Sequence, residues 1–175
     1  MKTFWTPWRV EHVRGATPVV EGCLFEPPGN ASHDAKYLLL YRDGKVVVLL
    51  NRYPYANGHL LVAPVRHIGC ITDLKSDENS AVMRMLQICA SILKKQLSPQ
   101  GLNIGCNIGK SAGAGIADHL HFHVVPRWDD DHNFMAVLAD LRTIPEHISA
   151  TFNRLLPDFI NLITTNSAKP NDPTG

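Results

Sequence analysis

Runs of apolar side chains divided by turn residues predict most of the strands in this chain. Residues 37–42 and 45–51 are β-branched or otherwise apolar, and Asp43-Gly44 between them is a strong signal for a tight hairpin turn. Three further strands are predicted, over residues 59–64, 102–108 and 119–127.

Helical spacing of apolar residues is clearest over residues 76–97, where Ser76 is the expected N-cap. A second helix is predicted over residues 146–164, with an interruption near Pro157, because proline cannot donate the helical backbone hydrogen bond. Together these elements predict an α+β fold, in which a long helix and a C-terminal helix pack on a mainly antiparallel sheet of five to six strands.

The chain is expected to form a single domain over residues 1–165. The first 35 residues are rich in proline and glycine, which is typical of an irregular arm. Residues 166–175 are expected to be a disordered tail.

Composition narrows the classes of partner. The net charge of +1 argues against a general electrostatic grip on nucleic acid or on an anionic membrane, so any anion site must be local. No apolar run reaches the roughly 20 residues that span a bilayer. The four cysteines are widely scattered and the start of the chain has no apolar signal region, so we expect reduced thiols and a cytoplasmic protein.

Three histidines, His119, His121 and His123, occupy every second position of the last predicted strand. Because side chains alternate along a strand, one face would present three imidazoles and the other apolar groups. The imidazoles could bind a metal, or one could act as a nucleophile while the others hold phosphate oxygens. A polar face without chemistry is disfavoured, because clustered imidazoles repel when protonated and need partners when buried.

A glycine-rich loop over residues 109–115 directly precedes the histidines. Its backbone N–H groups suit an anion better than a lone metal. Gly109-Lys110-Ser111 is similar to a fragment of a phosphate-binding loop, but Ile104 stands where that pattern requires glycine.

Residues 119–126 carry the signature of the histidine triad (HIT) family of nucleotide-binding proteins, and residues 51–64 resemble the upstream strand of that family. The branch that includes diadenosine tetraphosphate phosphorylases is resembled in three segments, residues 5–9, 107–127 and 126–128. The resemblance covers roughly residues 4–135 and implies a HIT-like fold.

The resemblance implies a role for each histidine. His121, the middle one, would attack the α-phosphate of an adenine nucleotide and form a covalent nucleotidyl-histidine, held in the right tautomer by a backbone carbonyl. His123 would contact the phosphate oxygens as charge builds on them. His119 would organise the site together with the upstream His59.

The resemblance also implies binding residues. Asn51 matches a residue that binds the ribose hydroxyls, and Asn107 one that approaches the bridging phosphate. Gly113 and Gly115 lie in the segment that would supply backbone donors, although many relatives carry serine where this chain has Gly115. A slot for the base is expected from apolar residues of the early segments, Leu24, Phe25 and Leu49.

A structural zinc site is a further expectation from the resemblance. Many relatives carry a Cys-x-x-Cys pair and two histidines, which here correspond to Cys23, Glu26, His67 and His119. Glu26 replaces the second cysteine; a carboxylate can bind zinc, but the loss of a thiolate weakens such a site. Zinc is therefore left open, and the chemistry itself is expected to need no cofactor.

The leading hypothesis is a nucleotidyl hydrolase or transferase that acts on adenine mono- or dinucleotides such as diadenosine tetraphosphate. Hydrolysis and phosphorolysis differ only in the acceptor, so both stay open. The alternatives are a nucleotide-binding sensor or interaction module with little turnover, and a zinc enzyme that uses the three histidines as ligands. The resemblance also implies a homodimer, and no nucleic acid or membrane partner is expected.

Overall fold

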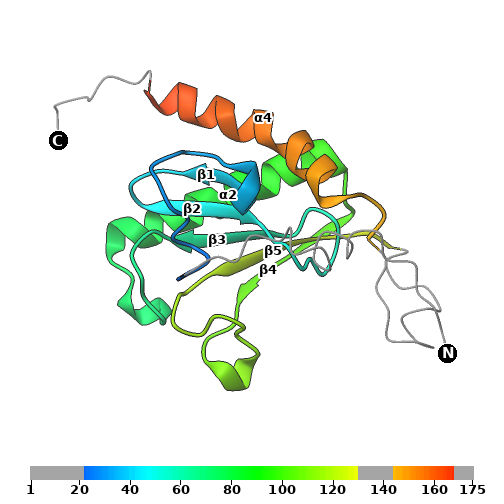
Figure 1. The fold of residues 1–175 in the computed structure, drawn as a ribbon. Helices are drawn as coiled ribbons and strands as arrows, with labels where there is room; N and C mark the ends of the chain where they lie inside the picture. The colour runs from blue at the N-terminus through cyan, green and yellow to red at the C-terminus, as the bar shows by residue number, and fades with distance from the viewer. Residues whose placement is uncertain (1–21, 130–143, 168–175) are drawn as a thin grey trace.

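The computed structural model describes residues 22–129 and 144–167 (Figure 1). Within them, five strands form one sheet in the order β1-β2-β3-β5-β4, and every neighbouring pair is antiparallel. The strands are β1 (Leu39–Arg42), β2 (Val46–Leu50), β3 (Leu60–Pro64), β4 (Gly101–Cys106) and β5 (Phe122–Arg127). The predicted α+β architecture with a mainly antiparallel sheet is confirmed.

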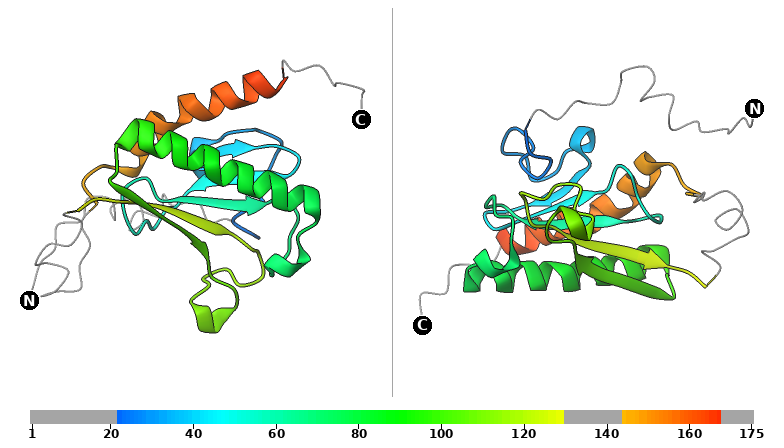
Figure 2. Two further views of the ribbon diagram at one scale, coloured as in Figure 1. Left: turned by 180° about the vertical axis from the view of Figure 1, so that it is seen from behind. Right: turned by 90° about the horizontal axis from the view of Figure 1, so that it is seen from below.

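Two helices, α2 (Ser76–Leu97) and α4 (Ile148–Ser167), pack on one face of the sheet, and the described part of the arm lies on the other (Figure 2). On the helix side, Val48, Leu60 and Val124 of the sheet join a core with residues of both helices. On the arm side, Phe25 packs against a smaller core that includes Leu49. Because both faces are covered, β2 is apolar without a break.

The predicted hairpin at Asp43-Gly44 is confirmed by the pairing of β1 with β2. The Asp43 carboxylate accepts hydrogen bonds from the backbone N–H groups of Lys45 and Val46, both at 2.7 Å, and so closes the turn. The same two strands carry the arm-side core that supports the histidines.

Some predicted strand limits are wrong. Residues Ala35–Tyr37 form a 3₁₀ turn, η1, so β1 begins at Leu39 instead of residue 37. β4 ends at Cys106, before the glycine loop. β5 begins at Phe122 instead of His119, because the N–H of Leu120 donates to the Ile68 carbonyl of a loop and not to a strand.

Two predictions about the helices are also wrong. Ser76 is already the first residue of α2; the N-cap is Lys75, whose backbone N–H donates to the Glu78 carboxylate at 2.9 Å. The predicted interruption near Pro157 does not occur, since α4 continues to Ser167. Pro157 and Asn153 are both exposed, so water can bond to the Asn153 carbonyl that proline leaves without a donor.

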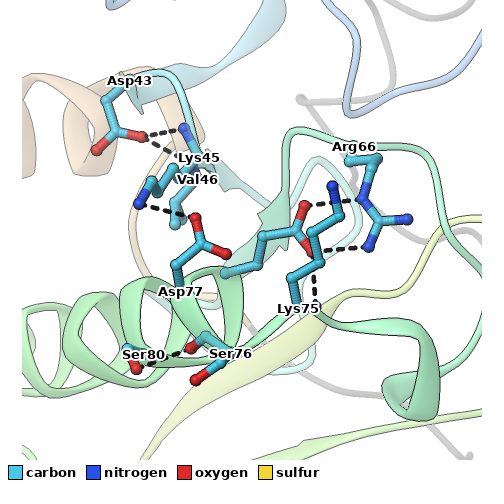
Figure 3. A network of polar contacts seen from close by, with 9 residues as sticks. Asp43, Lys45, Val46, Arg66, Lys75, Ser76, Asp77 and Ser80 are labelled. Carbon is cyan, nitrogen blue, oxygen red and sulfur yellow. Dashed lines mark hydrogen bonds and ion pairs between the residues drawn. The ribbon is translucent and has the colours of Figure 1, made fainter.

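Ion pairs fasten the N-terminal end of α2 to the sheet (Figure 3). Arg66 forms a bidentate bond to Glu78, with both N–O distances at 2.7 Å, and Lys45 lies 2.9 Å from Asp77. Arg66 follows β3 and directly precedes His67, so the pair holds the segment that carries a candidate metal ligand.

The described part of the arm, from residue 22, is irregular as expected apart from the η1 turn. Residues 1–21 and 168–175 lie outside the described residues, so the extent of the domain over 1–165 and the disordered tail stay predictions. The first two residues of the tail predicted over 166–175 are instead the last two residues of α4. None of the described helices is long and apolar enough to cross a membrane.

Candidate functional site

The three histidines lie on the sheet face opposite the helices. His123 pairs in register with Leu61 of the arm-side core, whereas Phe122 and Val124 face the helix-side core. The rings of His121 and His123 are 5.0 Å apart, and those of His119 and His121 lie 5.0 and 4.9 Å from the Phe25 ring. The alternation predicted from the sequence is therefore confirmed, and Phe25 supports two of the imidazoles.

One nitrogen of His121 is fixed as a donor by the backbone. Nδ1 lies 2.8 Å from the His119 carbonyl oxygen, which can only accept a hydrogen bond, so Nδ1 carries the proton. Nε2 then keeps its lone pair, as a nucleophile requires. His121 itself is 5% exposed, and a buried ring held at one nitrogen has little freedom to rotate.

His59 forms a hydrogen-bonded pair with His123. His59 Nδ1 accepts from the Tyr55 backbone N–H at 3.1 Å and from the Asn51 amide at 3.2 Å, so its proton is on Nε2. That N–H donates to His123 Nδ1 at 2.9 Å, which leaves Nε2 as the protonated nitrogen of His123. His59 thus contacts His123 of the triad, and its expected part, with His119, in organising the site stays a prediction.

Burial favours the neutral imidazoles of His59, His119 and His123 by lowering their pKa values. Burial, followed by the neighbouring His123 and His121, lowers the pKa of His59 to about 3. Burial also lowers the pKa of His123 and of His119. The neutral forms are those that the hydrogen bonds of His59 and His123 require, so geometry and electrostatics agree.

Asn51 has partners on both sides of its amide. Its oxygen accepts the Tyr53 backbone N–H at 3.0 Å while its nitrogen donates to His59. The structure therefore gives Asn51 a role in orienting His59, and the expected contact to ribose stays a prediction.

The glycine loop brings Asn107 and Gly113 together. Gly113 has φ +84°, a conformation that favours glycine, and a Cβ there would lie 3.9 Å from the Asn107 amide nitrogen. The Gly113 N–H donates to the Lys110 carbonyl at 3.0 Å and the Ala114 N–H to Gly109 at 3.4 Å. Two of the backbone donors expected for phosphate are thus engaged within the loop, and the role of Gly115 stays a prediction.

The residues expected to form the base slot differ in exposure. Phe25 and Leu49 are buried in the arm-side core, whereas Leu24 is partly exposed at its edge. A base slot built from these three residues stays a prediction.

Tyr55 was not singled out by the sequence. Its ring centroid lies 4.8 Å from that of His59 and 5.9 Å from that of His123, and the side chain is half exposed. Its backbone N–H also fixes His59. The only signal in the sequence was its place between Asn51 and His59.

The four residues expected to bind zinc converge. The ligand atoms of Cys23, Glu26, His67 and His119 all lie within 4.8 Å of one another. Cys23 Sγ is 3.1 Å from His119 Nδ1, and His67 Nδ1 is 2.8 Å from the Glu26 carboxylate. His119 Nε2 donates to the Pro64 carbonyl at 2.9 Å, so the lone pair of Nδ1 faces the group. One sulfur, two nitrogens and one oxygen suit zinc.

In the part of the chain that the structure describes, one group of histidine, cysteine and carboxylate side chains is close enough to hold a metal ion, and it is the group of Cys23, Glu26, His67 and His119. Of the triad, this group includes His119 alone. His123 has no lone pair free for a metal ion, because its Nδ1 accepts from His59 and its Nε2 carries the proton. The hypothesis of a zinc enzyme with three triad ligands therefore finds no support in the geometry.

Comparisons with known proteins agree with the site. A family model of the HIT domain matches residues 33–130. The AP-4-A phosphorylase of Mycobacterium tuberculosis (strain ATCC 25618 / H37Rv) is 35% identical over 167 residues, which cover 89% of this chain and 83% of that protein. The bis(5'-adenosyl)-triphosphatase of Saccharomyces cerevisiae is 29% identical, over 51% of this chain and 44% of that one.

A solved structure, that of a Zn-bound histidine triad family protein from Mycobacterium smegmatis, shares the fold. It is 26% identical and superposes with a TM-score of 0.58, over 73% of this chain and 87% of that chain. This likeness supports the HIT-like fold expected from the sequence.

Proposed function

Because this chain belongs to the histidine triad (HIT) family, we propose that it is an enzyme that splits adenine dinucleotides through a covalent intermediate on His121. The observation that carries the proposal is the bond from His121 Nδ1 to the His119 carbonyl, which fixes Nε2 as the unprotonated nitrogen. Relatives named AP-4-A phosphorylase and bis(5'-adenosyl)-triphosphatase support dinucleoside polyphosphates as the substrate class.

In the first step, the lone pair of His121 Nε2 forms a bond to the α-phosphorus, and the bond from that phosphorus to the bridging oxygen breaks. From diadenosine tetraphosphate the leaving group is ATP, which takes the electron pair, and AMP stays on the histidine. His123, with its proton on Nε2, is suited to meet the charge that grows on the phosphate oxygens. His59 and Asn51 keep that tautomer in place.

In the second step an acceptor attacks the same phosphorus, breaks the bond to nitrogen and restores His121. Water would give AMP, and inorganic phosphate would give ADP. The similarity to a protein named AP-4-A phosphorylase over 89% of this chain favours phosphate as the acceptor.

The test is product analysis with diadenosine tetraphosphate, with and without inorganic phosphate. We expect ATP and ADP when phosphate is present, and ATP and AMP with water alone. His121→Asn should abolish turnover, whereas His33→Asn, at an exposed histidine of the arm, should turn over like the wild type. Wild-type turnover by His121→Asn would refute the covalent mechanism.

A nucleotide-binding module with little turnover is the second candidate. It is favoured by the loop donors of Gly113 and Ala114, which are engaged within the loop and not presented to a phosphate. Calorimetry decides between the two: tight AMP binding by wild-type protein that splits no dinucleotide would favour the module.

We also propose that Cys23, Glu26, His67 and His119 hold a structural zinc ion. The convergence of their ligand atoms and the similarity to a protein described as Zn-bound support it. Bound zinc would tie the arm, through Cys23 and Glu26, to the segments that carry His67 and His119; His121 and His123, which would act on phosphate, are not among the four ligands. Metal analysis should find zinc in the wild type and less in Cys23→Ser.

A homodimer is proposed through β4, one of the two edge strands of the described sheet. Ile104 on this strand is 48% exposed, and an edge strand that is unpaired among the described residues and carries an exposed apolar side chain favours pairing with another copy. Light scattering should show a dimer that Ile104→Lys converts to a monomer. A cytoplasmic location and the absence of nucleic acid or membrane partners stay predictions; the four described cysteines are free thiols, as a reducing compartment favours.

A further inference from the structure

The start of helix α4 is bonded to the loop that leads into His59 (Figure 1). Asn57 donates from its amide to the Glu146 carboxylate at 3.2 Å. The Thr151 hydroxyl lies 2.7 Å from the same carboxylate and 2.9 Å from the Asn57 amide oxygen, so it can donate to either. Arg154 completes the cluster with an ion pair to Glu146 at 2.6 Å.

This cluster is polar, with Thr151 buried, Asn57 and Glu146 partly buried, and Arg154 exposed at its edge. Thr151 is 1% exposed, and the Glu146 side chain is 19% exposed. Burial by itself would raise the pKa of Glu146, but the hydrogen bonds from Thr151 and Asn57 and the charge of Arg154 outweigh it, and the pKa is lowered. Glu146 is therefore a carboxylate at neutral pH, which accepts from Asn57 and Arg154 and can accept from Thr151.

Asn57 lies between two groups that define the tautomer of His59. Tyr55 lies two residues before it, and the Tyr55 backbone N–H donates to His59 Nδ1. His59 lies two residues after it, and the His59 backbone N–H donates to the Ala56 carbonyl at 3.2 Å. Gly58, in between, has φ +77°, and a Cβ added there would overlap Leu97. A displacement of Asn57 therefore moves the Tyr55 donor relative to the imidazole that it holds.

We propose that Glu146 and Thr151 are positioning residues, which hold Asn57 so that the Tyr55 N–H stays on His59 Nδ1 and the proton of His123 stays on Nε2. The proposal rests on the proposed function of the His121 site. It makes α4, which lies beyond residues 33–130 that match the HIT domain, a support of the catalytic histidines.

If α4 had a purely structural role, loss of any of its contacts would be expected to lower stability in the same way. Phe152, Leu155 and Phe159 anchor the helix in the core, and Asp158 bonds to Lys95 and Gln96 of α2 at 2.5 and 2.6 Å. Asp158 thus offers a matched control: it fastens the same helix by a side-chain carboxylate, but to α2 and not to the loop.

The experiment compares Glu146→Ala, Glu146→Gln and Asp158→Ala for kcat, KM and the free energy of unfolding in urea. We expect Glu146→Ala to lose at least about tenfold in kcat with little change in KM, because misplacement of a reacting group by a fraction of an ångström has this effect. Glu146→Gln keeps an oxygen that accepts from Asn57 and Thr151, so it should recover most of the activity. Asp158→Ala should be less stable but turn over like the wild type.

A second readout needs no substrate. Nitrogen-15 NMR of the imidazoles reports which ring nitrogen is protonated, and Glu146→Ala should convert the single tautomer of His59 into a mixture, whereas Asp158→Ala should not. The proposal is overturned if Glu146→Ala retains the wild-type imidazole spectrum. It is also overturned if Asp158→Ala and Glu146→Ala have the same free energy of unfolding and lose kcat to the same extent. Should the wild type split no dinucleotide, the proposed function fails, and the imidazole spectra still decide the positioning role.

Discussion

Gly58, the residue before His59, is a position where one added methyl group should be costly. Its φ of +77° is strained for a residue with a side chain, which costs roughly 1–2 kcal/mol. A Cβ would also lie 2.3 Å from Leu97 Cδ1, 3.2 Å from Leu93 Cδ2 and 3.4 Å from Pro126 Cγ. Leu97 is partly exposed near the end of α2 and can turn away, so this overlap adds about 1 kcal/mol.

Gly58→Ala should therefore lower the free energy of unfolding by about 2–3 kcal/mol, with an unchanged urea m-value. For a chain of this size the thermal midpoint should fall by about 5–10 °C. The control is Gly44→Ala, at a glycine of the β1–β2 turn where an added Cβ meets nothing within 4 Å; it should be nearly neutral.

The two causes can be separated with Leu97. In a Leu97→Ala background the overlap disappears but the backbone strain does not, so Gly58→Ala should cost about 1 kcal/mol less there. Equal unfolding free energies for Gly58→Ala and Gly44→Ala would refute the reasoning. Loss of stability without any relief in the Leu97→Ala background would refute its steric part.

Three further predictions concern pH and metal. Hydrogen bonds from Arg66 and from the Lys75 backbone lower the pKa of Glu78 to about 2. The stability that this carboxylate adds is therefore present above its ordinary pKa of 4.5 and is lost as pH falls toward 2. Urea midpoints measured at a series of pH values should fall less steeply with acid in Glu78→Gln than in the wild type. Burial is the main cause that lowers the pKa of His59 from 6.5 to about 3. As pH falls, His59 is therefore protonated in the unfolded chain before it is protonated in the folded chain, so the free energy of unfolding should fall from pH 6.5 toward 3. This fall should be smaller in His59→Gln. Removal of bound zinc by a chelator should lower the thermal midpoint of the wild type, and Cys23→Ser should show a smaller chelator effect; an equal effect in both would contradict the assigned ligands.

Local patterns in the sequence were enough for much of the sheet. The hairpin at Asp43-Gly44 depends on neighbouring residues, so it was predicted correctly. The three histidines face one side as predicted, but only His123 does so as part of a strand, since β5 begins at Phe122. The convergence of Cys23 and Glu26 with His67 and His119 was anticipated from the family resemblance, since nothing in their spacing brings residues this far apart together.

Other features depend on contacts that the sequence does not reveal. Whether Pro157 interrupts a helix depends on the exposure of the carbonyl that it leaves free, which is a property of the fold. The pairing of His59 with His123 depends on the register of β3 against β5. The contact of Asn57 with Glu146 joins residues 89 positions apart, and no pattern in the sequence pairs them.

His119 touches two sites through different atoms. Its imidazole belongs to the group with Cys23, while its backbone carbonyl holds the Nδ1 proton of His121. A shift of His119 on binding at one of the two proposed sites would reach the other site through this residue, and any such coupling of binding free energies is reciprocal. By whatever factor a metal ion changes the affinity for nucleotide, nucleotide must change the affinity for the metal ion by the same factor.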